Sequence, residues 1–134
     1  MMRAALFTAL ACAAGLVSGP ASARDLQPVR DLDLQRYAGT WHEIARLPMY
    51  FERKCVRDIT ATYTPRDDGT ITVRNACVKA DGEAVVSEGV ARKAGSDPAK
   101  LLVRFAPGWL SALPFVWADY WVIAVDEDYR WAIV

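Results

Sequence analysis

The sequence predicts an all-β protein, built as a single antiparallel up-and-down barrel. From Trp41 onward, apolar and polar residues alternate with period two, as they do in strands that bury one face. Turn signals such as Asp67-Asp68-Gly69 and Asp81-Gly82 separate the alternating runs. No helical pattern is long enough to connect parallel strands, so consecutive strands should pair with their neighbours in the chain.

The composition is that of one neutral globular domain. A chain of 134 residues can bury one core. The 16 basic side chains balance the 16 acidic ones, which excludes the basic stripe that nucleic acid requires. Internal repeats, low-complexity segments and domain boundaries are absent after Arg24, so we expect one domain over residues 24–134.

A targeting segment precedes this domain. Met1-Met2-Arg3 is a basic start, residues 4–17 are apolar, and Ala21-Ser22-Ala23 has the form of a cleavage site. The alternative, a transmembrane anchor, is disfavoured because the apolar run is too short to span a bilayer comfortably. We therefore expect residues 1–23 to be a signal peptide that is removed on export.

The cysteines bear on processing and on stability. Lipoprotein processing at Cys12 is disfavoured, because Ala9-Leu10-Ala11 matches the leucine-led recognition box poorly and the apolar run before it is very short. Cleavage after Ala23 leaves Cys55 and Cys77. An even pair in an oxidising compartment predicts a disulfide, with two buried free thiols as the alternative.

The elements follow from the alternation. Residues 32–37 predict one or two helical turns, and the first strand runs over 41–47 until Pro48 stops it. Six more strands are predicted, over residues 57–64, 70–79, 84–92, 100–106, 120–125 and 129–134.

Two connections are long and apolar. Met49, Tyr50 and Phe51 crowd the first loop, and Trp109 lies in the loop over 107–117. Alternate hairpin loops share an end of an up-and-down barrel, so both should rim one mouth. They predict a lid or a surface that contacts membrane, unless they fold under and close the barrel.

The glycine and tryptophan at the start of the first strand predict the floor of the barrel. Gly39 allows close backbone approach, and the Trp41 indole can plug one end of a sheet that curls on itself. Small alanines among aromatics would leave room for a ligand. Alternation from Trp41 predicts an interior lined by Ala45, Ile59, Ala61, Tyr63, Val73, Asn75, Val103, Phe105, Tyr120, Val122 and Ala124.

Catalytic and metal-binding patterns are missing from the sequence. The one histidine, His42, lies on the face opposite Trp41, and we find no catalytic triad, zinc spacing or phosphate loop, so we expect no cofactor. Glu43 shares the Trp41 face, where it would contact a ligand head group or join a structural polar network. An enzyme would have only Glu43 as acid or base. A haem or tetrapyrrole carrier would lack an inward histidine.

The motifs resemble those of a known family. Gly39-Thr40-Trp41 resembles the first lipocalin motif, and Asp119-Tyr120 resembles the second, with Ala118 in place of the usual threonine. The similarity covers residues 32–134. Four runs resemble the bacterial lipocalin (Blc-type) and apolipoprotein D branch: Tyr37-Ala-Gly-Thr-Trp-His-Glu-Ile-Ala-Arg-Leu-Pro48, Phe51-Glu-Arg-Lys-Cys55, Thr60-Ala-Thr-Tyr63 and Asp68-Gly69.

This resemblance implies a function. It implies an eight-stranded barrel with Trp41 at the floor of a cup-shaped cavity. The ligands would be fatty acids, lysophospholipids or similar amphiphiles, held for storage or transport at the bacterial envelope. Bacterial members of the family are periplasmic or attached to the outer membrane, and we expect a non-enzymatic protein of this kind.

The resemblance also implies parts that we do not find before Val134. These are an eighth strand, the arginine of a third motif that packs across the floor tryptophan, and a helix lying on the barrel. The sequence therefore predicts a C-terminally incomplete domain that is weakened and prone to aggregate. Either two sheet edges stay unpaired, or the first strand pairs directly with the seventh.

Overall fold

The computed structural model describes residues 25–48, 50 and 53–134. The expected signal peptide over residues 1–23, with Cys12 in it, lies outside the described residues. So do Met49 and Phe51 of the first apolar loop.

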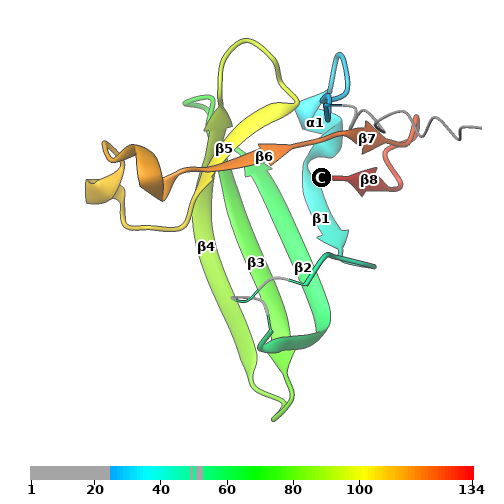
Figure 1. Cartoon of the computed structure of the whole chain (residues 1–134), viewed down its shortest axis with the longest axis vertical. Helices are drawn as coiled ribbons and strands as arrows, with labels where there is room; N and C mark the ends of the chain where they lie inside the picture. Colours follow the sequence, from blue (N-terminus) through cyan, green and yellow to red (C-terminus); the bar gives the residue numbers. More distant parts are fainter. Residues whose placement is uncertain (1–24, 49, 51–52) are drawn as a thin grey trace, which may run out of the picture.

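Six antiparallel strands form one sheet in chain order, which confirms the predicted meander (Figure 1). Two further strands form a separate antiparallel pair, and two 3-10 turns, η2 (Gly108–Leu110) and η3 (Pro114–Val116), interrupt the long apolar loop. The six strands are β1 (Gly39–His42), β2 (Cys55–Pro65), β3 (Ile71–Lys79), β4 (Ala84–Lys93), β5 (Lys100–Arg104) and β6 (Ala118–Trp121), and the pair consists of β7 (Ala124–Val125) and β8 (Ala132–Ile133).

The predicted helical turn is present as α1 (Leu34–Tyr37). Asp33 caps it, because its Oδ1 accepts the backbone N–H groups of Gln35 at 2.9 Å and Arg36 at 3.2 Å. Gly39 then turns the chain into β1 with φ of +108°, which disfavours any other residue. The expected close backbone approach at Gly39 is wrong, since no atom lies within 4 Å of the place a Cβ would take.

One face of the sheet carries the core, and we call it the inner face. The strand register sets Tyr63 beside Val73, Ile71 beside Ala91, and Leu101 beside Tyr120. Leu32 and Tyr37, from the chain before β1, join the same buried cluster. The alternation of β2 to β5 therefore buries the face that the sequence predicts.

The first strand is shorter than predicted, since β1 ends at His42 and not at residue 47. Glu43 N–H still donates to the carbonyl of Ile59 at 2.9 Å. Beyond that point the register between β2 and β3 shifts twice, between Cys55 and Thr60, and Asp58 adopts φ of +53°. Such bulges bend a strand, so the first part of β2 turns away from the line of β1.

The predicted sixth strand, residues 120–125, is divided into β6 and β7. Val122 lies at the division, where its N–H donates to the carbonyl of Ala99 at 3.0 Å and its carbonyl accepts from Val29 N–H at 2.8 Å. Because β5 starts only at Lys100, no further β5 residue is available to continue the ladder past Trp121.

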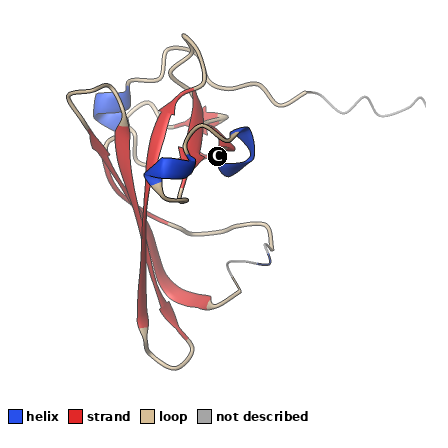
Figure 2. Cartoon of the chain, turned by 90° about the vertical axis from the view of Figure 1, so that its left-hand side faces the viewer, coloured by secondary structure: helices blue, strands red, loops and turns tan. Residues whose placement is uncertain are grey.

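The sheet is open among the described residues (Figure 2). Strands β1 and β6 form its two edges, and β8 pairs with β7 and not with β1. Of the two arrangements that the sequence allows, the structure has unpaired edges. The direct pairing of the first strand with the last does not form.

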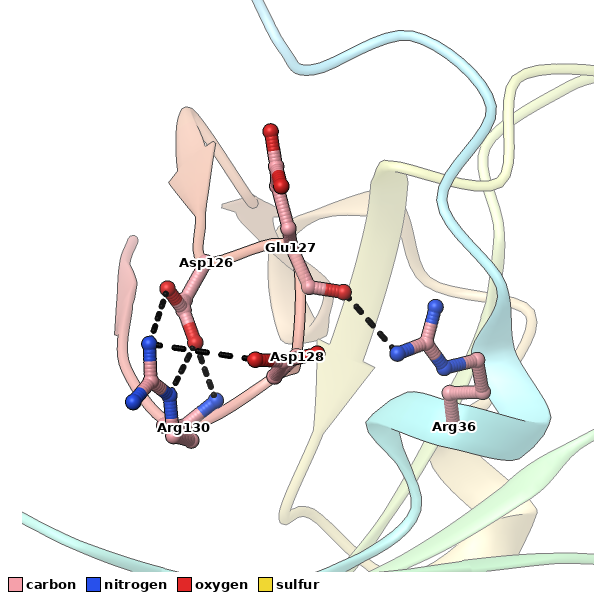
Figure 3. Close-up of polar contacts among 5 residues, drawn as sticks. All are labelled: Arg36, Asp126, Glu127, Asp128 and Arg130. Carbon is pink, nitrogen blue, oxygen red and sulfur yellow. Dashed lines mark hydrogen bonds and ion pairs between the residues drawn. The ribbon is translucent and has the colours of Figure 1, made fainter.

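Contacts with α1 hold the turn between β7 and β8 in place (Figure 3). Arg36 donates from Nη2 to the carbonyl of Glu127 at 2.9 Å, and its guanidinium lies 4.2 Å from the ring centre of Tyr129. The Tyr129 hydroxyl in turn accepts the N–H of Asp33 at 2.9 Å. Within the turn, hydrogen bonds from Arg130 hold the pKa of Asp126 below its ordinary value.

The two apolar loops lie on different sides of the sheet in Figure 1. The loop over 107–117 is to the left of the sheet, and the described part of the first loop is at the lower right. The short β5 brings the chain out of the sheet well before the end reached by β3 and β4. The common mouth stays a prediction, because Met49 and Phe51 lie outside the described residues.

Candidate ligand-binding face

Three tyrosine hydroxyls meet on the inner face. The Tyr120 hydroxyl lies 2.8 Å from that of Tyr37 and accepts a hydrogen bond of 2.8 Å from that of Tyr63. These residues come from α1, β2 and β6, so the contact joins the helix before the sheet to the second and the last of its six strands. Three phenolic protons share two hydroxyl–hydroxyl hydrogen bonds, which leaves one donor for another acceptor.

The Trp41 indole lies on this tyrosine cluster. Its ring stacks on Tyr37 with centres 4.8 Å apart, and its Nε1 donates to the Tyr37 carbonyl at 2.8 Å. The indole is half-buried. Trp41 thus packs on Tyr37, a contact that the sequence does not predict.

Burial keeps the cluster uncharged. It raises the pKa of Tyr63 to about 12, and it raises the pKa values of Tyr37 and Tyr120 as well. The cluster is therefore neutral at any physiological pH. It can donate or accept a hydrogen bond, but it offers no charge to a ligand.

The predicted lining residues fall into three groups. Four are buried on the inner face: Tyr63, Val73, Val103 and Val122. Four are partly buried: Ile59, Ala61, Tyr120 and Ala124. Four lie at the surface: Glu43, Ala45, Asn75 and Phe105.

Glu43 does not point into a covered interior. Its Oε1 accepts a hydrogen bond of 2.9 Å from Arg46, whose Nη2 also donates to the carbonyl of Cys55 at 3.1 Å. The predicted inward placement of Glu43 and Ala45 is wrong in this structure, because it assumed that the alternation of β1 continues to residue 47. Glu43 instead helps to tie the chain after β1 to the start of β2.

Phe105 lies across Gly89 of β4. A Cβ added to Gly89 would come within 2.8 Å of the Phe105 ring and 2.5 Å of the Arg104 carbonyl. Any larger residue at position 89 would therefore displace either the ring or the strand. Glycine is required here for close approach, which the alternation pattern does not reveal.

Several inner-face residues are missing from the predicted set. Ile71 and Leu101 are buried in the same cluster, and strict alternation along β3 and β5 could have found them. Tyr37 is only 3% exposed, but it precedes the strands, so period-two alternation carries no information about it. Its place at the end of the helical turn predicted over residues 32–37 is the only local signal.

The predicted disulfide is confirmed. Cys55 and Cys77 are bonded, with Cα atoms 5.6 Å apart, and the bond joins the first residue of β2 to β3. Cys77 is buried. The bond therefore fixes the irregular first part of β2 against its neighbour.

Among the described residues, His, Cys, Asp and Glu form no group that could hold a metal ion. In the same part of the chain, no helix is long and apolar enough to cross a membrane.

Comparison with known proteins identifies the family. The lipocalin-like domain matches residues 32–134, and the chain belongs to the lipocalin family. This confirms the resemblance that the sequence motifs indicate.

Relatives come from plants, bacteria and animals. The chain is 42% identical over 114 residues to temperature-induced lipocalin-1 of Arabidopsis thaliana, and the alignment covers 83% of the chain and 60% of that protein. It is 41% identical over 138 residues to the outer membrane lipoprotein Blc of Escherichia coli K12, with 99% of the chain and 73% of that protein covered. It is 36% identical over 104 residues to rat apolipoprotein D, with 75% of the chain and 50% of that protein covered. The chain thus spans about half to three quarters of the length of these relatives.

Proposed function

We propose that this lipocalin binds a fatty acid, a lysophospholipid or a similar amphiphile on its inner face, and that it acts by burying the ligand without chemistry. The observation that carries the proposal is the aromatic and aliphatic inner face, floored by Trp41 on the neutral tyrosine cluster. Each buried CH₂ contributes about 0.8 kcal/mol, so a long acyl chain can offset the cost of ordering it.

The proposed contacts follow the face. Ile59, Ala61 and Ala124, which are partly exposed, would pack against the acyl chain. The buried side chains of Val73, Val103 and Val122 would support them from beneath. Tyr63 and Tyr120 would bound the deep end of the ligand. Asn75 and Phe105 would lie at the open side, where a head group meets water.

We further propose that the protein acts at the bacterial envelope, in the periplasm. The signal peptide that the sequence predicts over residues 1–23 supports this location. The Cys55–Cys77 disulfide supports it too, because such bonds persist in oxidising compartments. Relatives in Escherichia coli and Citrobacter freundii are named outer membrane lipoproteins, which also fits the envelope.

The geometry favours lipid binding over the two alternatives, an enzyme that uses Glu43 and a haem or tetrapyrrole carrier. Glu43 is committed to an ion pair of 2.9 Å with Arg46, at the surface. His42, the one histidine of the chain, lies on the outer face beside Thr60. An enzyme based on Glu43 or a haem carrier would require side chains that the inner face does not offer.

Native mass spectrometry of protein purified from the periplasm tests the proposal. We expect a co-purifying amphiphile, and saturable binding of hexadecanoic acid to the emptied protein. Ala61→Phe should weaken this binding at least tenfold, because it fills the inner face between Trp41 and Asn75. The matched control is Ala76→Phe, on the outer face beside Thr60. A folded protein that binds no amphiphile, or equal effects of both variants, would contradict the proposal.

A further inference from the structure

The loop over residues 105–117, which we call the aromatic loop, carries no charged residue. Four of its large apolar side chains are exposed, and Trp109 and Phe115 are 81% and 80% exposed, with Phe105 and Leu113 beside them in the sequence. Single exposed apolar residues are ordinary, but a run of them in one uncharged segment marks an interaction surface.

The aromatic loop is an ordered structure. In η2, Leu110 N–H donates to the Pro107 carbonyl at 3.0 Å, and in η3, Trp117 N–H donates to the Pro114 carbonyl at 3.2 Å. Trp117 Nε1 also donates to the Ser111 carbonyl at 2.9 Å, across the loop. These bonds give the loop a defined shape in which Trp109 and Phe115 stay exposed. The loop itself lies to the left of the sheet in Figure 1.

Two arginines lie directly behind the loop. The guanidinium of Arg92 lies 4.3 Å from the ring centre of Trp117, and that of Arg104 lies 5.1 Å from it. Arg104 also donates to the Ala106 carbonyl at 2.8 Å. The base of an apolar loop is therefore positively charged, although the chain as a whole is neutral.

A shallow hollow of about 520 Å³ adjoins this base. Arg66 and Arg104 line it together with Thr72, Glu88 and Gly108. Glu88 is 4.0 Å from Arg74 of the neighbouring strand, which does not itself line the hollow. Arg66 and Arg104 therefore place positive charge beside the base of the loop.

We propose that the aromatic loop docks this protein on a bilayer that contains anionic phospholipid. Trp109 and Phe115 insert at the level of the lipid head groups, and Arg92 and Arg66 lie against lipid phosphates. The charge pattern selects this occupant, since an apolar tip with a basic base matches an apolar layer beneath anionic phosphates. A protein partner with a plain apolar surface would have no use for the arginines.

Co-sedimentation of the whole protein with vesicles tests this proposal, with vesicles of phosphatidylcholine alone and of phosphatidylcholine mixed with phosphatidylglycerol. We expect binding to the mixed vesicles that weakens as salt is added. Trp109→Ala combined with Phe115→Ala should reduce the partition coefficient at least tenfold. Arg92→Gln should reduce it about fivefold on the mixed vesicles and leave phosphatidylcholine unaffected.

Matched controls use the first loop and the outer face. Tyr50 is 81% exposed with Arg53 over its ring, so Tyr50→Ala removes an equally exposed aromatic side chain beside an arginine. Arg74→Gln removes an exposed arginine that lies outside the aromatic loop. Neither should change the partition coefficient by more than twofold. Because none of these residues belongs to the inner face, hexadecanoic acid binding should be unchanged in every variant.

Three outcomes would overturn the proposal. The first is equal binding to both kinds of vesicle. The second is a loss caused by Tyr50→Ala as large as that caused by the aromatic-loop variant. The third is an absence of vesicle binding together with a dimer that the aromatic-loop variant abolishes, which would assign the loop to a second copy of this chain.

Discussion

The phenol oxygens of Tyr37 and Tyr120 lie 2.8 Å apart, although 83 positions separate the two residues in the chain. Tyr37 belongs to the short helix before the sheet, and Tyr120 belongs to its last strand. Tyr63 completes the cluster by donating to the same Tyr120 oxygen. In an open sheet, this contact ties one edge to the other across the inner face.

Tyr120→Phe should destabilise the fold by about 1–2 kcal/mol. The change keeps the ring but removes the oxygen that serves two buried hydroxyls, and buried polar groups without partners are costly. Urea unfolding followed by fluorescence measures the effect. Tyr50→Phe, at an exposed tyrosine, is the control and should change stability by less than about 0.5 kcal/mol. Equal effects would mean that the cluster contributes nothing.

The stability of the fold should fall as the pH rises above 10. The pKa of Tyr63 is raised from 10.0 to about 12 in the folded state, so the folded protein holds this proton more tightly than the unfolded chain does. That contribution is complete below pH 10 and is lost as the pH approaches about 12. Urea unfolding across this range measures it. The fall in the free energy of unfolding with pH should be less steep in Tyr63→Phe. An equally steep fall would show that Tyr63 does not cause it.

Loss of the disulfide should lower the free energy of unfolding by about 3 kcal/mol, because the bond restricts the conformations of the unfolded chain. Cys55→Ser combined with Cys77→Ser tests this against the oxidised protein, with loss of order expected first in the bulged part of β2. Thiol labelling of the unreduced protein is a direct check. Two reactive thiols in that sample would contradict the bond between Cys55 and Cys77.

Arg36→Gln should loosen the β7–β8 pair without unfolding the sheet. It removes both the hydrogen bond to the Glu127 carbonyl and the contact with the Tyr129 ring. Amide hydrogen exchange should become faster between residues 124 and 133, whereas β2 to β4 should keep their protection. Arg57→Gln, at an exposed arginine on β2, is the control. Unchanged exchange in Arg36→Gln would show that other contacts hold the pair.

The predicted elements agree with the structure where the prediction depends only on residues close together in the chain. Period-two alternation identifies the face that carries Tyr63, Val73 and Val103, because alternate side chains of a regular strand point to the same face of the sheet. The turn residues Asp68-Gly69 lie in the hairpin between β2 and β3, and Asp81-Gly82 lie in the hairpin between β3 and β4, as predicted. The disulfide is predicted from the even pair of cysteines left after cleavage and from the oxidising compartment, and the structure confirms it.

Two predictions fail for different reasons. The inward placement of Glu43 and Ala45 extends β1 past His42, whereas the bulges in β2 end that pairing. The close backbone approach expected at Gly39 does not occur, because no atom lies within 4 Å of the place a Cβ would take there.

The sequence by itself determined the family, the order of the strands, the disulfide pair and the face that becomes buried, because alternation, turns and motifs are properties of short segments. Only the tertiary structure decided that Tyr37 joins Tyr63 and Tyr120, that Glu43 pairs with Arg46, and that two arginines flank Trp117. Each of these contacts joins side chains whose distance depends on strand register and on the path of the loops, and neighbours in the chain do not fix that distance.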